Sequence, residues 1–73
     1  MRNLFKPGNR LIVKQVNYQH RAGKMLIDMG ITPETMLLVD RVAPLGEPFI
    51  IKVRDYSLAL RKSDLMALTV ELR

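Results

Sequence analysis

The sequence predicts a mainly β fold, a small barrel of about five short strands with one short amphipathic helix after the first strand. Three observations predict it. Runs of alternating apolar and polar residues, the period of a half-buried strand, recur along the chain. Proline and glycine turns separate most of these runs. A single segment changes to the helical period. Closure into a barrel would remove the exposed strand edges that promote aggregation.

The first strand is predicted over residues 10–16, RLIVKQV, because this run is rich in β-branched residues. It begins after Pro7-Gly8, a turn in which proline presets φ and glycine is free to adopt a positive φ. A turn before the run and a change of period after it therefore set the limits of this strand.

The helix is predicted within residues 20–30, HRAGKMLIDMG. Its apolar stripe, spaced i, i+3, i+4 and i+7 and expected to face the core, consists of Ala22, Met25, Leu26 and Met29. Gly30 stands where a helix end favours a left-handed residue, and Ile31 would fold back onto the last turn. Gly23 costs about 1 kcal/mol relative to alanine inside a helix. Either packing holds this helix, or another segment approaches it closely at Gly23.

The remaining strands are predicted over residues 36–42, 49–54, 58–61 and 69–73, each with a period of two. Residues 32–35, Thr-Pro-Glu-Thr, form a turn before the first of these strands. Pro44 and Pro48 bracket another turn, and neither proline can donate a hydrogen bond to a sheet, so strand pairing stops between them. Ser63 is placed to cap one helical turn before the last strand.

The composition is that of one folded domain covering residues 1–73, with 48% apolar and 26% charged residues. Cysteine is absent, which excludes disulfides, thiolate metal sites and thiol nucleophiles and fits a reducing cytoplasm. No apolar run approaches the roughly 20 residues of a spanning helix, and the N-terminal MRNLFKPGNR lacks the apolar region of a secretory signal. The net charge of +5 favours an anionic partner, which could be nucleic acid, a lipid surface or an acidic protein face.

Reactive side chains are few and are not clustered in the sequence. His20, the single histidine, lies at the expected start of the helix, and its spacing from Ser57 and Ser63 does not indicate a catalytic triad. The seven acidic residues are spread along the chain, mostly at turns, which is typical of solubilising charges rather than of a general acid and base. The sequence therefore predicts a protein that is not an enzyme, with no catalytic residues, no cofactor and no small-molecule substrate.

Two other functions stay open as alternatives. Ferrous iron in a mononuclear site requires two imidazoles and a carboxylate. One histidine per chain cannot supply them without oligomerisation, so no metal ligands are predicted, and a weak site of oxygen ligands for a transition metal remains the alternative. Nucleic-acid binding fits the charge. However, single-strand binders stack bases on aromatic side chains, and this chain has only two tyrosines and two phenylalanines.

Several motifs stand together along the chain. They are Leu26–Gly30 at the helix end, Thr32-Pro33, the corner Arg41–Pro48, and Leu58–Arg61, with Pro7-Gly8 near the start. In this combination and order they resemble the signature of the FeoA family, the small cytoplasmic accessory proteins of bacterial ferrous iron uptake. The resemblance spans nearly the whole chain.

The resemblance implies an SH3-like β-barrel, which agrees with the strand count, and no established catalytic residues. It also implies a partner, the large membrane ferrous iron transporter FeoB with its cytoplasmic GTP-binding domain. The expected function is to dock on this transporter and to modulate it by protein–protein contact, in the cytoplasm or at the inner face of the membrane where the partner recruits it. The same barrel occurs in some iron-dependent repressors, so a repressor-associated or nucleic-acid-binding barrel is the alternative. A weak homo-oligomer is compatible with both.

Two positions depart from the family pattern. Glycine commonly follows the proline where Glu34 stands, so this turn is expected to differ in type. The basic pair at the helix start is reduced to Arg21 and Lys24. The candidate contacts to the partner are Arg21, Leu26, Met29, Leu45 and Tyr56, of which Leu26 and Met29 could equally belong to the core. The rigid proline corner is expected to present Leu45 beside the helix at low entropic cost.

Overall fold

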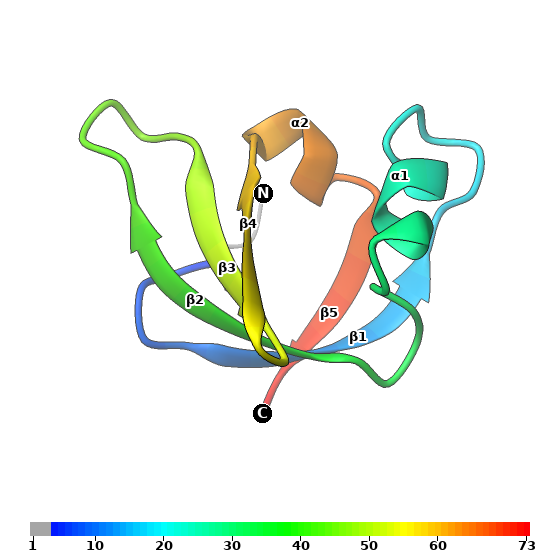
Figure 1. The fold of residues 1–73 in the computed structure, drawn as a ribbon, viewed down its shortest axis with the longest axis horizontal. Coiled ribbons are helices and arrows are strands. Elements are labelled where there is room, and N and C mark those ends of the chain that lie inside the picture. Colours follow the sequence, from blue (N-terminus) through cyan, green and yellow to red (C-terminus); the bar gives the residue numbers. More distant parts are fainter. Residues whose placement is uncertain (1–3) are drawn as a thin grey trace.

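The computed structural model describes residues 4–73 as a strongly curved antiparallel sheet with two short helices on its concave side (Figure 1). The elements in chain order are β1 (Arg10–Val16), α1 (Gly23–Asp28), β2 (Met36–Val42), β3 (Phe49–Val53), β4 (Tyr56–Leu60), α2 (Lys62–Leu65) and β5 (Leu68–Leu72). Neither helix in this part of the chain is long and apolar enough to cross a membrane.

The five strands form one sheet in the order β4-β3-β2-β1-β5, and every neighbouring pair is antiparallel. The bounds of β1 and β2 coincide with the runs of alternating residues in the sequence. The register shifts in β2 between Val39 and Arg41 and in β1 between Val13 and Gln15, so each strand holds one extra residue there. Such bulges bend a strand and increase its twist, and they help to curl this short sheet around its own core.

The barrel is not closed, contrary to the sequence prediction. Within the residues that the structure describes, β4 and β5 are the two edges of the sheet and do not pair with each other. The α2 turn connects these strands and lies between their ends (Figure 1). Its Leu65 is buried, and so is Phe5 of the N-terminal segment, whose ring packs edge-on against Phe49 at 6.3 Å between centroids. Side chains rather than a fifth hydrogen-bonded pairing of strands therefore fill this side of the fold.

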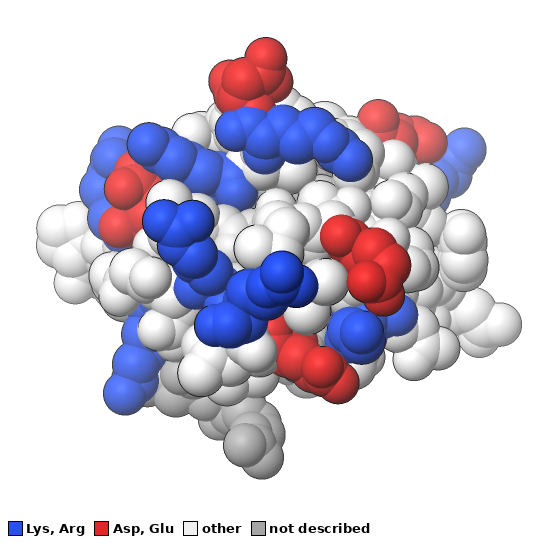
Figure 2. Space-filling view, turned by 90° about the horizontal axis from the view of Figure 1, so that it is seen from below, with Lys and Arg blue, Asp and Glu red and all other residues white. Residues whose placement is uncertain are grey.

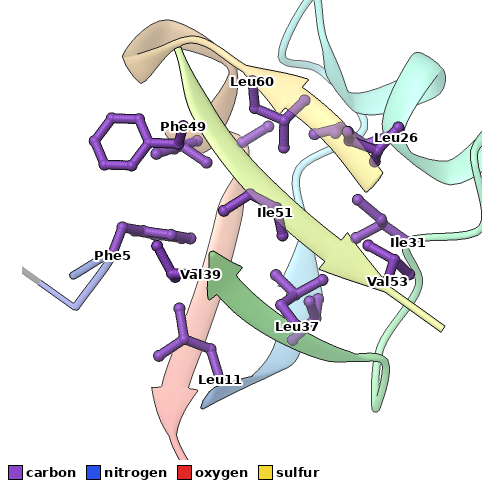
Figure 3. Close-up of a cluster of buried hydrophobic side chains, with 14 of the residues drawn as sticks. Phe5, Leu11, Leu26, Ile31, Leu37, Val39, Phe49, Ile51, Val53 and Leu60 are labelled. Carbon is purple, nitrogen blue, oxygen red and sulfur yellow. The ribbon is translucent and has the colours of Figure 1, made fainter. Parts of the chain in front are cut away.

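The core consists of the side chains that point to the concave side of the sheet. On β3 and β4, and on β1 and β2 up to their bulges, the buried residues alternate with more exposed ones, as the period of two requires, whereas β5 at the sheet edge has no fully buried residue. The largest of the fully buried side chains are Leu11, Leu26, Ile31, Leu37, Ile51, Leu65, Val13, Val39 and Val53, and Figure 3 shows most of them converging from the strands and from the segment around α1. Burial of this small cluster is the main stabilising contribution in so short a chain.

The α2 turn begins differently from the sequence prediction. Ser63 does not cap it, because the residue before the helix is Arg61 and Ser63 lies inside the helix. The side chain of Asp64 supplies the capping interaction, since its Oδ2 accepts the backbone N–H of Arg61 at 2.9 Å. A carboxylate in the first turn of a helix also interacts favourably with the helix dipole.

Candidate interaction surface

The start of α1 is held by a close approach of the loop that follows β1. A Cβ atom built on Gly23 would lie 2.2 Å from the backbone carbonyl oxygen of Asn17, a distance that no side chain can tolerate. The same carbonyl accepts the N–H of His20 at 3.2 Å, and the N–H of Gly23 donates to the His20 carbonyl at 2.8 Å. The close approach expected as one explanation of Gly23 is therefore present, and the approaching segment belongs to the chain itself.

The end of α1 has the geometry that its sequence predicts. Gly30 has a φ of +96°, its N–H donates to the carbonyl of Ile27 at 2.9 Å, and the N–H of Ile31 donates to that of Leu26 at 2.9 Å. This pair of bonds is the Schellman motif. The side chain of Ile31 folds back into the core and is fully buried.

The tip of the β3–β4 hairpin fixes this helix end from outside. The hydroxyl of Tyr56 donates to the carbonyl oxygen of Met29, and Nη1 of Arg54 donates to that of Gly30 at 3.2 Å. Met29 is the C-cap of α1 and Gly30 follows it, so these carbonyls have no partner within the helix. Tyr56 is half-buried. It therefore acts as a brace for α1, with only part of its ring left for contact with another molecule.

Three of the candidate contacts lie at α1, and two of them are exposed while the third is buried. Arg21 is exposed just before the helix, and Met29 is 42% exposed at its end. Met25 is also 42% exposed, so the prediction that both methionines face the core is wrong. The helix is only six residues long and buries a narrower stripe than its sequence pattern suggests. Leu26 lies in that stripe and is fully buried, so it is a core residue and not a surface contact.

Leu45 lies at the tip of the loop between β2 and β3. The N–H of Gly46 donates to the carbonyl of Ala43 at 2.9 Å, which places Pro44 and Leu45 in the middle of a β-turn. The base of the loop is closed by the N–H of Ala43, which donates to the carbonyl of Pro48 at 3.1 Å. The side chain of Leu45 is 96% exposed, the most exposed large apolar residue in the described chain.

Leu45 does not lie beside α1, contrary to the prediction from sequence. The β2–β3 loop and α1 stand at opposite sides of the curved sheet (Figure 1). The loop is tied instead to α2, because Oε1 of Glu47 accepts the backbone N–H of Lys62 at 2.8 Å. The candidate contacts therefore form two separate groups. Arg21, Met29 and Tyr56 gather at α1, and Leu45 stands alone at the other side.

Besides the exposed residues at α1 and Leu45, the structure has an apolar groove that the sequence analysis did not predict. An open groove of about 840 Å³ runs along β5 and is lined by Leu4, Phe5, Leu65, Met66, Leu68, Thr69, Val70, Glu71 and Leu72. Met66 and Leu72 are 64% and 59% exposed. The residues come from the N-terminal segment, α2 and the last strand, which no local pattern connects. The one signal in the sequence is the apolar residue Met66 directly after the helical turn.

The side chains that bind metals are not brought together within residues 4–73. No group of three or more His, Cys, Asp and Glu side chains in this part of the chain could hold a metal ion. His20 uses Nδ1 to accept the backbone N–H of Ala22 at 3.0 Å, which is a structural contact at the start of α1. The two ion pairs among the described residues, Lys14–Glu34 at 3.4 Å and Arg41–Asp40 at 3.0 Å, are solvent-exposed.

Comparison with known proteins agrees with this geometry. The model of the FeoA domain matches residues 3–72. The chain belongs to the FeoA family. Members of this family are accessory proteins of ferrous iron transport and are not a known family of enzymes. A FeoA-like protein from Clostridium acetobutylicum is 30% identical, with 92% of this chain and 78% of that chain covered and a TM-score of 0.86.

Two crystal structures are also similar. An iron uptake regulatory protein (FeoA) is 29% identical, with 96% of this chain and 95% of that chain covered and a TM-score of 0.80. The FeoA of Stenotrophomonas maltophilia, described as a prokaryotic SH3 domain protein and crystallised with zinc, is 19% identical, with coverages of 97% and 91% and a TM-score of 0.79. At that identity the similarity shows the fold alone. The fold of this FeoA chain is thus SH3-like, with an open rather than a closed barrel.

Proposed function

We propose that this FeoA chain acts in the cytoplasm by docking on the cytosolic GTP-binding portion of a FeoB-type ferrous iron transporter and shifting its conformational populations. The contact supplies binding energy that differs between the states of the transporter, which is the thermodynamic requirement for any such modulation. Arg21, Met29, Leu45 and Tyr56 are the proposed contact residues, and Leu26 is excluded because it is buried.

The observation that carries the proposal is the exposure of Leu45. A large apolar side chain that is 96% exposed at the tip of a hydrogen-bonded turn contributes little to the stability of the fold. Pro44 presets φ at one corner of this turn, and Glu47 anchors the base of the loop to α2. The tip therefore loses little conformational freedom when it enters an apolar pocket of a partner, which favours binding.

A pull-down with the isolated cytosolic domain of the transporter, with and without guanine nucleotide, tests the proposal. We expect Leu45→Ser to weaken binding about tenfold or more, because the loss of a buried apolar anchor that is a binding hot spot costs about 1.4 kcal/mol or more. A difference in affinity between the nucleotide-bound and nucleotide-free states would identify which population the chain stabilises.

The matched control is Tyr18→Ser, because Tyr18 is 75% exposed in the loop before α1 and is not a proposed contact. This control should bind like the unmodified chain. Equal affinity of the Leu45 variant and the unmodified chain would remove Leu45 from the interface. The absence of any binding by the unmodified chain, in both nucleotide states, would refute docking on this domain.

A further inference from the structure

The convex side of the sheet is an exposed surface that neither helix covers, because α1 and α2 both lie on the concave side (Figure 1). Its residues are those that alternate with the core positions of each strand. Figure 2, seen from below, shows many basic side chains spread over this side of the molecule, with fewer acidic ones between them. We call this surface the outer sheet face.

The strand register places three cations in one row across the outer sheet face. Arg10 on β1 pairs with Leu38 on β2, and Leu38 pairs in turn with Lys52 on β3. The two cations are thus two strands apart, roughly 10 Å at the usual strand spacing. The N–H of Arg73 donates to the carbonyl of Arg10 at 2.8 Å, so Arg73 continues the row next to β1.

No ion pair neutralises this row, although one carboxylate, that of Glu71 on β5, lies on the same face opposite Ile12. The ion pairs in residues 4–73 use Lys14 with Glu34 and Arg41 with Asp40, and none involves Arg10, Lys52 or Arg73. Like charges that face each other across neighbouring strands are destabilising. Within the row this applies to Arg10 and Arg73, which face each other, whereas Lys52 lies two strands from Arg10; an external anion near the row would gain from all three cations.

Apolar side chains fill the space between these cations. Ile12, Leu38 and Ile50 point to the same face and are only partly buried, and Met36 is 40% exposed. Ile12 pairs with Met36, so the two are adjacent across β1 and β2. The outer sheet face thus combines exposed cations with an exposed apolar surface.

We propose that the outer sheet face binds the surface of an anionic lipid bilayer, with Arg10, Lys52 and Arg73 on lipid phosphate groups and with Ile12, Met36 and Leu38 at the headgroup boundary. Peripheral binding of this kind gains from basic residues near anionic headgroups and from apolar area in the interface. Three cations give weak, reversible binding, which holds the chain at the membrane and leaves α1 and the Leu45 loop directed away from it.

Nucleic acid is a poorer match for the same face. The outward positions of the described strands carry no aromatic residue on which a base could stack. A phosphodiester backbone also offers no apolar surface to Ile12, Leu38 and Met36. A bilayer interface offers both anionic phosphate groups and apolar surface, and for this reason it is the occupant that we assign.

Cosedimentation with lipid vesicles tests this assignment. The full chain should bind vesicles of equal parts phosphatidylcholine and phosphatidylglycerol and should not bind phosphatidylcholine alone. Arg10→Gln and Lys52→Gln should each weaken binding about fivefold, and the double variant about 25-fold, from the usual contribution of one basic residue near an anionic surface. Both side chains are exposed, so thermal unfolding of the double variant should match that of the unmodified chain.

The matched control is the double variant Lys24→Gln and Lys62→Gln, which has the same net charge but alters α1 and α2 on the other side of the molecule. It should change vesicle binding less than about twofold. Equal weakening by the two double variants would show an effect of net charge without a defined face, and would overturn the proposal. Displacement of the chain from vesicles by a random oligonucleotide at equal phosphate concentration would overturn it in favour of nucleic acid. The vesicles contain no transporter, so the result is independent of docking on FeoB.

Discussion

The two long connections of the sheet, residues 17–35 between β1 and β2 and residues 43–48 between β2 and β3, are built in opposite ways. Each contains a β-turn with proline at its second position, Pro33 in one and Pro44 in the other. In the first connection the turn is joined to the core at several points. Its last residue, Thr35, is only 5% exposed, and the backbone of Thr35 accepts the N–H of Val13 at 2.9 Å. In the second connection, Leu45 at the tip is 96% exposed.

The difference shows that a proline turn does not by itself indicate what its loop does. The first connection holds α1 against β1 and contributes to the stability of the fold, because its backbone groups are bonded to β1. The second is fastened only at its base, by Ala43 and Glu47, so its tip is free for other contacts. We therefore expect substitutions in the first connection to change stability and substitutions at the tip of the second to change binding.

The largest expected effect is that of Gly23→Ala in the first connection. In most helices this change is stabilising by about 1 kcal/mol. Here the new Cβ would lie 2.2 Å from the Asn17 carbonyl oxygen, so the loop or the helix must move. We expect a loss of about 3 kcal/mol, at the upper end of what overpacking costs, measured as the free energy of unfolding in urea.

Lys24→Ala is the matched control for this change, because Lys24 is the next residue of α1 and is exposed. Its effect on the free energy of unfolding should stay within about 0.5 kcal/mol. A stabilising effect of Gly23→Ala would mean that the contact with Asn17 relaxes at no cost. The first connection would then be no more tightly packed than the second.

The same two connections show what the sequence could and could not predict. The strands β1 and β2 and the Schellman end of α1 were predicted correctly, because alternation, proline and the position of Gly30 act over a few residues. The side of α1 that faces the core, the open edge between β4 and β5, and the distance of Leu45 from α1 were predicted wrongly. The last two features depend on how far the whole sheet curls, and the first depends on how short α1 is in the folded chain; no local pattern encodes either.

The second largest effect is expected for Thr35→Val. The Oγ1 atom of Thr35 accepts the backbone N–H of Thr32 at 3.1 Å and donates to the carbonyl of Gly30 at 3.4 Å. Valine has the same shape but leaves the partly buried N–H of Thr32 without a partner, which typically costs about 2 kcal/mol, while the carbonyl of Gly30 keeps its bond from Arg54. Thr69→Val is the control, since Thr69 is exposed on β5. Equal effects of the two variants in urea unfolding would show that the hydroxyl of Thr35 is not a structural element of the turn.

Glu34→Gly should be stabilising, by up to about 1 kcal/mol. Glu34 has a φ of +76°, the conformation that a type II turn requires at its third position, so the turn keeps the geometry that favours glycine. A residue with a Cβ atom is destabilised by about 1 kcal/mol or more in this conformation, and the greater freedom of glycine in the unfolded chain offsets part of the gain.

The variant also loses the ion pair between Glu34 and Lys14, which is exposed and contributes little to stability. Glu34→Gln, which removes the charge and keeps the strain, separates the two effects. A loss of stability in both variants would mean that the ion pair outweighs the strain.

The smallest effect on stability is expected for Leu45→Ser, the variant that should change binding most. The side chain of Leu45 is 96% exposed, so it buries almost no apolar area when the chain folds. Its truncation should therefore change the free energy of unfolding by less than about 0.5 kcal/mol. The measurement is the urea midpoint, compared with that of the unmodified chain under identical conditions. A loss of 2 kcal/mol or more is typical of a buried leucine. Such a loss would show that the tip packs against the fold in solution, and it would end the distinction between a connection that stabilises the domain and one that is free for binding.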